Sequence, residues 1–267
     1  MAIYDCFQYF NEDHMVDIRM SILSEYVDYF VISESTKTHQ GNKKELNFNI
    51  NNFSKYKHKI KYLIADFEEE KVDENHKGGE SLIEQHQRNY LANGIKDASD
   101  NDLIILSDSD EIPDLSKLNQ IKTKTKYTAF SQMMFMYKLN LQNLNESNWI
   151  GSKICKKKDF PLPQKLRDMK FKKYPFWRID KKNIQIINGG WHFSFLQSPK
   201  DIIKKIKSYS HGEFNTDSNT NEKNVIEKIL KNEDIFNRGF NLKKIDLDLN
   251  FPSFILKNRE KLKKWII

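Results

Sequence analysis

Short hydrophobic runs alternate with segments of helical spacing through the first 107 residues of the chain. Runs rich in β-branched and aromatic residues predict four strands, at 2–10, 27–33, 59–65 and 102–107. Apolar residues spaced three and four apart, from Met15 to Leu23, predict a helix between the first two strands. A second helix is predicted at 81–96, after a Glu- and Lys-rich loop at 67–80. Strands that alternate with helices indicate an α/β fold whose central sheet is mostly parallel and flanked by helices.

After Pro113 this alternation weakens. The Met- and aromatic-rich segment 129–140 predicts another core strand, and 199–210 predicts a basic amphipathic helix. The stretch 156–175 contains three prolines and is predicted to be irregular. Gly189 and Gly190 predict a bend or a close backbone approach just ahead of an aromatic and an imidazole side chain. Because there is no internal repeat or linker, residues 1–267 are interpreted as a single domain.

Charge and hydropathy narrow the class of protein and of ligand. The mean hydropathy is −0.73, and no apolar run approaches the ~18–20 residues that span a bilayer. The N-terminus lacks the features of a signal peptide, and Cys6 and Cys155 are expected to be reduced core residues, so a cytoplasmic location is expected. The net charge of +7 comes from scattered lysines and favours an anionic substrate over nucleic acid. Residues 257–267 predict a terminal helix, with a peripheral contact to the inner face of an anionic membrane as the alternative.

The most informative polar residues follow the strand predicted at 102–107. Asp108 and Asp110 lie at its carboxyl end, where open α/β sheets bind ligands. Two neighbouring carboxylates are not stable as desolvated free anions, so they are expected to bind a cation or to stay in water. Oxygen ligands suit Mg²⁺ or Mn²⁺, which proteins commonly hold through one or two carboxylates plus substrate phosphates. The pattern therefore predicts a platform for a metal-bound nucleoside diphosphate.

Other interpretations of this acidic pattern stay open at the level of sequence. The residues can form a solvated turn in which Asp114 begins a helix. A phosphatase of the haloacid dehalogenase type also carries Asp-x-Asp after a hydrophobic strand, although Glu111 and Ile112 depart from the residues usual in that class. A non-catalytic carbohydrate-binding protein is the third alternative. An EF-hand is disfavoured because the required glycine after Asp110 is missing.

Several motifs, in order along the chain, resemble those of glycosyltransferase family 17. The matching residues are Ile3 to Phe7, Asn11, Glu12, Arg19, Val27 to Ser35, Gly41, Lys43, Glu84, Arg88, Asn89, Asp108 to Pro113, Gly190 to His192, Ser194, Lys205, Ser208, Glu213 and Pro252 to Asn258. The resemblance implies a GT-A fold, with 1–115 as the nucleotide-sugar-binding half and 116–267 as the acceptor-side half. It also implies a nucleotide-sugar donor, a divalent metal (Mn²⁺ or Mg²⁺) and transfer with inversion.

The resemblance implies roles for individual residues. Asp110 is the expected direct metal ligand, Asp108 is expected to reach the metal through water or to hold the ribose, and His192 is the expected third ligand. Nucleotide-sugar contacts are expected for a larger set, namely Asn11, Glu12, Glu34, Ser35, Arg88, Asn89, Asp108, Trp191 and Lys205. Among these, Trp191 is expected to stack on a sugar face. A packing, capping or solvated-surface role stays open for each of them.

The catalytic base and the substrates are the last expectations. An inverting reaction needs a carboxylate on the acceptor side, for which Glu213 is the first choice, Glu111 the second and Asp217 the third. The resemblance implies a UDP-sugar donor that carries N-acetylglucosamine. A related hexose stays open, because His39 and Gln40 depart from the family pattern and the tryptophan common ahead of Glu84 is absent. Without a membrane anchor or stem, the acceptor is expected to be a glycan or glycolipid, such as a precursor of a cell-surface polysaccharide or lipopolysaccharide.

Overall fold

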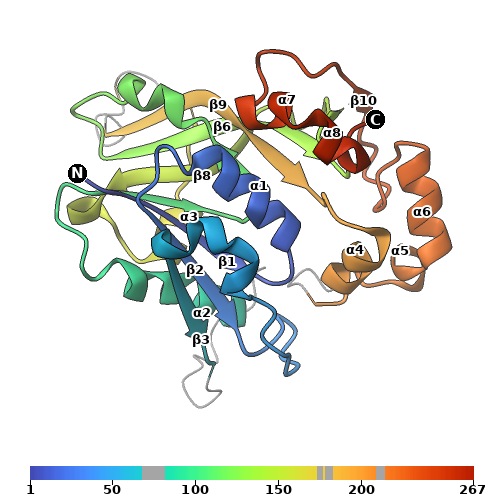
Figure 1. Ribbon diagram of the computed structural model, residues 1–267, viewed down its shortest axis with the longest axis horizontal. Coiled ribbons are helices and arrows are strands. Elements are labelled where there is room, and N and C mark those ends of the chain that lie inside the picture. Colours follow the sequence, from blue (N-terminus) through green and yellow to red (C-terminus); the bar gives the residue numbers. More distant parts are fainter. Residues whose placement is uncertain (68–81, 173–176, 178–182, 209–213) are drawn as a thin grey trace.

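The computed structural model describes residues 1–67, 82–172, 177, 183–208 and 214–267, and ten strands of this part of the chain form one sheet (Figure 1). Four neighbouring strands are parallel, in the order β4-β1-β2-β3. They are β1 (Ile3–Tyr9), β2 (Tyr29–Ser35), β3 (Ile60–Ala65) and β4 (Leu103–Ser107). In chain order, the helices of this half are α1 (Asp13–Leu23), the 3-10 helix η1 (Ile50–Lys59), α2 (Leu82–Tyr90) and the 3-10 helix η3 (Leu91–Ile95). The predicted α/β fold with a parallel central sheet flanked by helices is confirmed.

Both faces of β1, β2 and β4 are buried, as their continuous hydrophobic runs require, whereas the edge strand β3 is mostly half-buried. Successive side chains of a strand point to opposite faces, so Phe7 packs into one core cluster and Cys6 into another. Helix α1 and the C-terminal helix α7 (Ser253–Lys257) contribute to the first cluster, whereas η3 and helix α3 (Pro163–Asp168) contribute to the second. Both cysteines are free and buried, as the sequence predicted.

The other half of the sheet contains the antiparallel pairs. Its strands are β5 (Glu111–Pro113), β6 (Tyr127–Met136), β7 (Leu141–Asn143), β8 (Trp149–Lys156), β9 (Ile184–Ser194) and β10 (Leu242–Lys244). Strand β8 joins the halves, because it lies antiparallel between β4 and β6. The sequence did not reveal β8, since the buried polar side chains of Ser152 and Lys153 interrupt its hydrophobic pattern.

Two predictions for this half need correction. The segment 156–175, predicted to be irregular, contains the 3-10 helix η5 (Lys157–Asp159) and helix α3, because Pro163 occupies the first turn of α3, where no backbone N–H is needed. The bend predicted at Gly189 and Gly190 is absent, since β9 continues through both glycines with a register shift against β6. The predicted close approach is confirmed. A Cβ atom on Gly190, whose φ is +116°, would lie 2.4 Å from the Ile112 carbonyl oxygen.

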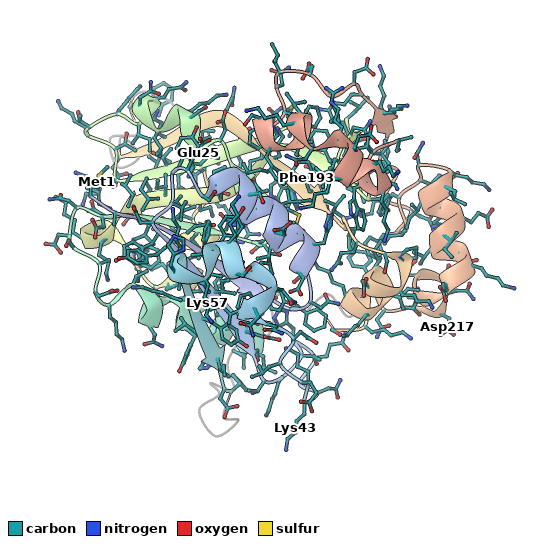
Figure 2. All side chains as sticks on the ribbon, in the orientation of Figure 1. Met1, Glu25, Lys43, Lys57, Phe193 and Asp217 are labelled. Carbon is teal, nitrogen blue, oxygen red and sulfur yellow. The ribbon has the colours of Figure 1, made fainter. Side chains whose placement is uncertain are left out.

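The remaining helices come after β5 in the chain. They are α4 (Pro199–Ile206), α5 (Asp217–Thr220), α6 (Glu222–Leu230), α8 (Arg259–Leu262), and the 3-10 helices η4 (Leu115–Gln120) and η8 (Lys263–Trp265). The predicted terminal helix is thus several short helices, interrupted at Asn258. Figure 2 shows Phe193 of β9 in the interior, while Lys43 and Asp217 lie at the periphery. Within the described ranges, no helix is both long and apolar enough to cross a membrane.

Candidate active site

Side chains at and just beyond the carboxyl ends of β1, β4 and β9 line a cleft of about 320 Å³. This is the edge at which α/β sheets bind ligands. The cleft gathers residues from distant parts of the chain, including Glu12, Asp108, Asp110, His192 and Lys205. Sequence analysis predicted each of these five as a site residue, and the fold brings them to one place.

A buried arginine holds the Asp-x-Asp turn in position. Arg19 of α1 forms a two-pronged ion pair with Asp5 of β1, with contacts of 2.6 and 2.7 Å, and neither side chain is exposed. Its remaining nitrogen donates to the backbone carbonyls of Glu111 at 2.6 Å and Asp108 at 3.1 Å. A planar guanidinium suits this task because it has several donors in a fixed geometry. Arg19 therefore ties the first helix and the first strand to the turn after β4.

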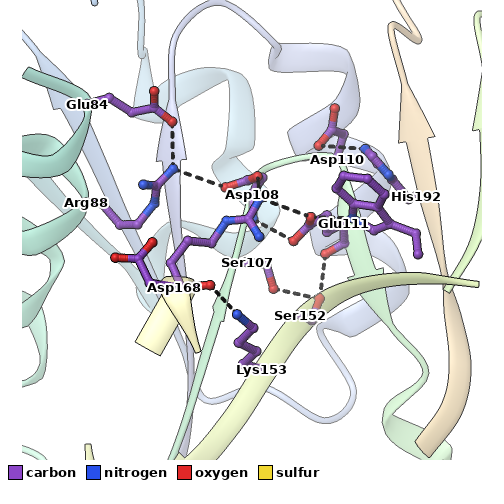
Figure 3. Close-up of polar contacts among 12 residues, drawn as sticks. Glu84, Arg88, Ser107, Asp108, Asp110, Glu111, Ser152, Lys153, Asp168 and His192 are labelled. Carbon is purple, nitrogen blue, oxygen red and sulfur yellow. Dashed lines mark hydrogen bonds and ion pairs between the residues drawn. The ribbon is translucent and has the colours of Figure 1, made fainter. Parts of the chain in front are cut away.

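Asp108 faces two arginines. Its Oδ2 atom lies 2.9 Å from Nη2 of Arg167, and its Oδ1 atom lies 3.6 Å from Nη2 of Arg88. Figure 3 shows the chain of contacts from Glu84 through Arg88 to Asp108, and Arg88 lies 2.7 Å from Glu84. Burial raises the pKa of Asp108, but the two guanidinium charges outweigh this effect and hold the pKa below its ordinary value. Asp108 is therefore ionised and already compensated.

Helix α3 carries Arg167 at the cleft, and side chains of β8 and α2 hold both ends of this helix in place. The Lys153 side chain of β8 is buried, and its Nζ donates to the carbonyls of Leu166, Arg167 and Met169 at the end of α3. Burial lowers the pKa of Lys153 to about 8. At the start of the helix, the Asn89 side chain accepts from the backbone N–H of Gln164 at 2.9 Å. These contacts fix the backbone that carries Arg167.

Asp110 has different neighbours. Its Oδ1 lies 3.6 Å from Nε2 of His192 (Figure 3). Its Oδ2 lies 3.8 Å from Nζ of Lys205, and this Nζ is also 3.3 Å from Glu12. Burial raises the pKa of Asp110, but Lys205 and His192 outweigh it and hold the pKa well below its ordinary value. Burial lowers the pKa of His192, but the negative charge of Asp110 and the other nearby carboxylates raises it by more, so the pKa lies above its ordinary value. The site thus places an anionic carboxylate opposite an imidazole without a direct hydrogen bond between them.

Glu34, predicted to contact the nucleotide, is fully buried and serves a loop. One carboxylate oxygen accepts from Lys44 Nζ at 2.5 Å and from the backbone N–H of Asn47 at 2.8 Å. The other accepts from the N–H of Phe48 and from the Tyr62 hydroxyl. Because four donors surround this carboxylate, its observed contacts shape the loop beside the cleft, and its predicted nucleotide contact stays a prediction.

Three further predicted residues lie around the cleft rather than in it. Ser35 is buried, and its hydroxyl accepts from the backbone N–H of Lys37. The Asn11 side chain accepts from Gln197 at 3.3 Å. Trp191 points to the other face of β9 from His192, donates to the Asn250 carbonyl at 3.0 Å, and lines a separate hollow of about 860 Å³. Their roles in donor binding stay predictions.

The candidate bases differ in position. Glu213 lies outside the described residues. Glu111 is 1% exposed, and its carboxylate accepts from the Trp149 indole at 2.7 Å and from the Asp108 backbone N–H at 3.1 Å. Asp217 is exposed at the start of α5 and does not line the cleft. Among the described residues, no three His, Cys, Asp or Glu side chains converge as a ready-made metal site.

Sequence reasoning missed several residues that shape this site. Arg167 and Trp149 line the cleft, and Lys153 supports Arg167 from below. Arg167 belongs to the segment that was predicted to be irregular, and no helix or strand was predicted for the segment that contains Trp149 and Lys153. A signal was available for Lys153, since a lysine between Ser152 and Ile154 in an otherwise apolar stretch is expected to be buried with partners if the stretch is a strand.

Comparisons with known proteins add a family. The sequence matches the model of glycosyltransferase family 17 over residues 1–239. No match was found among curated proteins. Similar solved structures include a glycosyltransferase involved in the glycosylation of the major capsid of PBCV-1, at 11% identity and a TM-score of 0.29, covering 70% of this chain and 81% of that chain. Another is HddC from Yersinia pseudotuberculosis complexed with GMP-PN, at 12% identity and a TM-score of 0.35, covering 80% of this chain and 100% of that chain.

A third similar structure is the inositol-1-phosphate CTP transferase from T. maritima, at 10% identity and a TM-score of 0.31, covering 100% of this chain and 98% of that chain. The family assignment rests on the sequence match, which spans most of the chain and includes both the Asp-x-Asp turn and the strand that carries His192. This protein belongs to glycosyltransferase family 17.

Proposed function

We propose that this protein is a metal-dependent inverting glycosyltransferase. It transfers N-acetylglucosamine or a related hexose from a UDP-sugar to a glycan or glycolipid, such as a precursor of a cell-surface polysaccharide or lipopolysaccharide. The observation that carries the proposal is the placement of Asp110 and His192, 3.6 Å apart, in a cleft at the carboxyl edge of the sheet. Family membership supports a transferase over the phosphatase and the carbohydrate-binding protein.

The residues of the cleft fit a divalent metal. Two adjacent ligands, each about 2.1 Å from an octahedral ion, lie about 3 Å apart, which is close to the separation of Asp110 Oδ1 and His192 Nε2. Carboxylate and imidazole together suit Mn²⁺, and substrate phosphates commonly complete such a site. Asp110 and His192 would hold the ion, and Asp108 would reach it through water. When bound, the ion would neutralise charge on the leaving nucleoside diphosphate.

The chain's own residues supply the rest of the donor site. Lys205 lies within reach of the region beside Asp110 and offsets phosphate charge there. The aromatic rings of Phe10, Trp149 and Phe195 also line the cleft and offer apolar faces to a base or a sugar ring. The cleft therefore combines charged groups with aromatic faces, such as Trp149 beside His192 and Phe195 beside Lys205, and a nucleotide sugar requires both kinds of contact.

The acceptor hydroxyl must lose a proton to a carboxylate during an inverting displacement. Glu213 is the proposed base. Glu111 is the weaker candidate, because the Trp149 indole and the Asp108 backbone N–H already donate to its two oxygens. Replacing each by glutamine in turn, and measuring transfer with donor binding intact, distinguishes them.

The thermal unfolding of the purified protein with Mn²⁺ and a panel of nucleoside diphosphates tests the proposal. A ligand that binds only the folded state stabilises it by about 2.7 kcal/mol at a hundredfold excess over Kd. We expect a metal-dependent rise in the unfolding temperature with UDP that is lost in Asp110→Ala. The exposed residue Asp246 provides a matched control, since Asp246→Ala removes a carboxylate that does not line the cleft.

Two outcomes would contradict the proposal. The absence of any nucleotide-dependent shift in the wild-type protein, together with phosphate release from simple phosphomonoesters, would favour the phosphatase. Binding of glycans without nucleotide or metal, unchanged in Asp110→Ala, would favour the carbohydrate-binding protein.

A further inference from the structure

We propose that Arg167 is a ligand of the donor diphosphate, and that Asp108 holds this arginine in the cleft until the donor binds. The inference rests on the proposed function and names a residue that is not among the motif residues identified in the sequence. It also gives Asp108 a role distinct from that of Asp110.

The geometry identifies Arg167 as the exchangeable cation of the pair beside Asp108. Its Nη2 lies 2.9 Å from Asp108 and 3.8 Å from Glu111, and its side chain is 21% exposed at the cleft. Arg88, in contrast, is 3% exposed and is engaged by Glu84 at 2.7 Å and by Gln164. Arg88 is therefore a fixed partner of Asp108, whereas Arg167 borders the space into which a ligand enters.

The support beneath Arg167 limits any movement to its side chain. Lys153 binds three carbonyls at the end of α3, and Asn89 caps its start. A helix held at both ends keeps its Cα positions, while a long arginine side chain can still rotate at the surface. The fold thus fixes the Cα atom of Arg167 beside the Asp-x-Asp turn and leaves its guanidinium able to rotate.

Charge explains why the partner changes. A divalent cation near the aspartates would neutralise part of the negative charge that now attracts Arg167 and would repel the guanidinium. A diphosphate carries a larger negative charge than one carboxylate. It also presents pairs of acceptor oxygens, which suit the two parallel donors of a planar guanidinium. Arg167 is therefore expected to pass from Asp108 to the diphosphate when metal and donor bind together.

This exchange has a signature that a purely structural arginine lacks. Without nucleotide, Arg167 competes with metal for Asp108, so Arg167→Gln should bind Mn²⁺ about two- to fivefold more tightly than wild type. With Mn²⁺ present, the same variant should bind UDP about 10- to 100-fold more weakly, because it loses a charge-assisted contact. Arg167→Lys keeps the charge but not the paired donors and should give an intermediate UDP affinity.

The experiment measures both affinities on the same proteins. Free Mn²⁺ is followed by electron paramagnetic resonance without nucleotide, and UDP binding is followed by calorimetry at saturating Mn²⁺. Lys165→Ala is the matched control, because Lys165 is a cation on the same helix but is exposed and does not line the cleft. Thermal unfolding without ligand verifies that each variant is folded.

Opposite changes in the two affinities would support the inference. If Mn²⁺ and UDP affinities both fall together, or if neither changes, the proposed exchange is wrong while UDP binding by the wild type leaves the proposed function standing. If the wild-type protein binds no nucleoside diphosphate with metal, the proposed function itself fails, and the inference fails with it.

Discussion

The two aspartates of the Asp-x-Asp turn have different surroundings although a single residue separates them. Asp108 contacts Arg167 directly, and Arg88 lies close by, so two permanently charged groups from α2 and α3 face it. Asp110 faces His192 and Lys205 from β9 and α4, at 3.6 and 3.8 Å. We call these the arginine side and the histidine side of the cleft.

The difference shows how one turn can hold two carboxylates for two purposes. On the arginine side, Arg88 and Arg167 compensate the charge, and Lys153 and Asn89 hold the helix that carries Arg167, so the compensation is present before any ligand binds. On the histidine side, the distances exceed hydrogen-bond length, and an incoming cation would improve the compensation. Under our proposals, Asp108 would position the arginine that binds the diphosphate, whereas Asp110 would bind the metal.

The largest effect is expected at Arg19, because it holds the turn that carries both Asp108 and Asp110. Arg19→Met should lower the free energy of unfolding by about 3–5 kcal/mol, because it leaves Asp5 buried without its partner and frees the carbonyls of the turn. Urea unfolding measures the loss. The double variant with Asp5→Leu removes the orphaned charge and should recover part of it. A loss below about 1 kcal/mol would mean that the pair does not hold the turn.

The next effect separates the two sides directly. Asp110→Asn should lower the rate of UDP release from a UDP-sugar by about 10²-fold or more, because the proposed metal loses its carboxylate. Asp108→Asn should lower it less, since Asp108 would reach the metal only through water, and the amide can still accept a hydrogen bond from Arg167 before the donor binds. Steady-state rates with Mn²⁺ check the order. Equal losses in the two variants would remove the distinction between the sides.

The sequence predicted the histidine side better than the arginine side for a physical reason. The elements of the histidine side have clear patterns in the sequence: Asp110 follows β4, His192 lies in β9 and Lys205 lies in α4. Their proximity at the edge of the sheet therefore follows from the topology. Arg167 and Lys153 belong to α3 and β8, whose patterns are short or interrupted by buried polar groups. Their meeting depends on tertiary packing, which local spacing does not encode.

The same limit explains errors in the fold. The parallel strands were predictable because burial on both faces makes continuous apolar runs. Gly189 and Gly190 predicted either a bend or a close backbone approach, and the structure shows the second, because Gly190 permits close packing against Ile112 of the neighbouring strand. A glycine pair has the same appearance in sequence whether it turns the chain or admits a neighbour, so only the structure decides.

On the arginine side, Lys153→Met should lower the free energy of unfolding at pH 7.5 by about 1–3 kcal/mol. The substitution keeps most of the volume of the side chain but leaves buried carbonyls at the end of α3 without a donor. It should also weaken UDP binding through misplacement of Arg167. Urea unfolding and calorimetry measure the two losses. Full stability with normal UDP binding would mean that α3 is held by other contacts.

The same lysine predicts a pH dependence. Its pKa is about 8 in the folded protein and about 10.4 in an unfolded chain, so between these values the unfolded state binds the extra proton. Stability must then rise with pH through this window. Between pH 7.5 and 9.5 the wild-type protein should gain about 1–2 kcal/mol relative to Lys153→Met. Parallel unfolding curves for the two proteins, with no change in their separation, would contradict the prediction.

The smallest effect concerns the start of α3. Asn89→Ala removes the side chain that accepts from the backbone N–H of Gln164, and such caps contribute about 1 kcal/mol. Because the cap supports only the helix that carries Arg167, the variant should weaken UDP binding slightly while Mn²⁺ binding through Asp110 and His192 stays at the wild-type value. Asn89→Asp keeps an acceptor and should restore UDP binding. A loss of Mn²⁺ binding in Asn89→Ala would show that the two sides of the cleft are coupled through α3 and do not act independently.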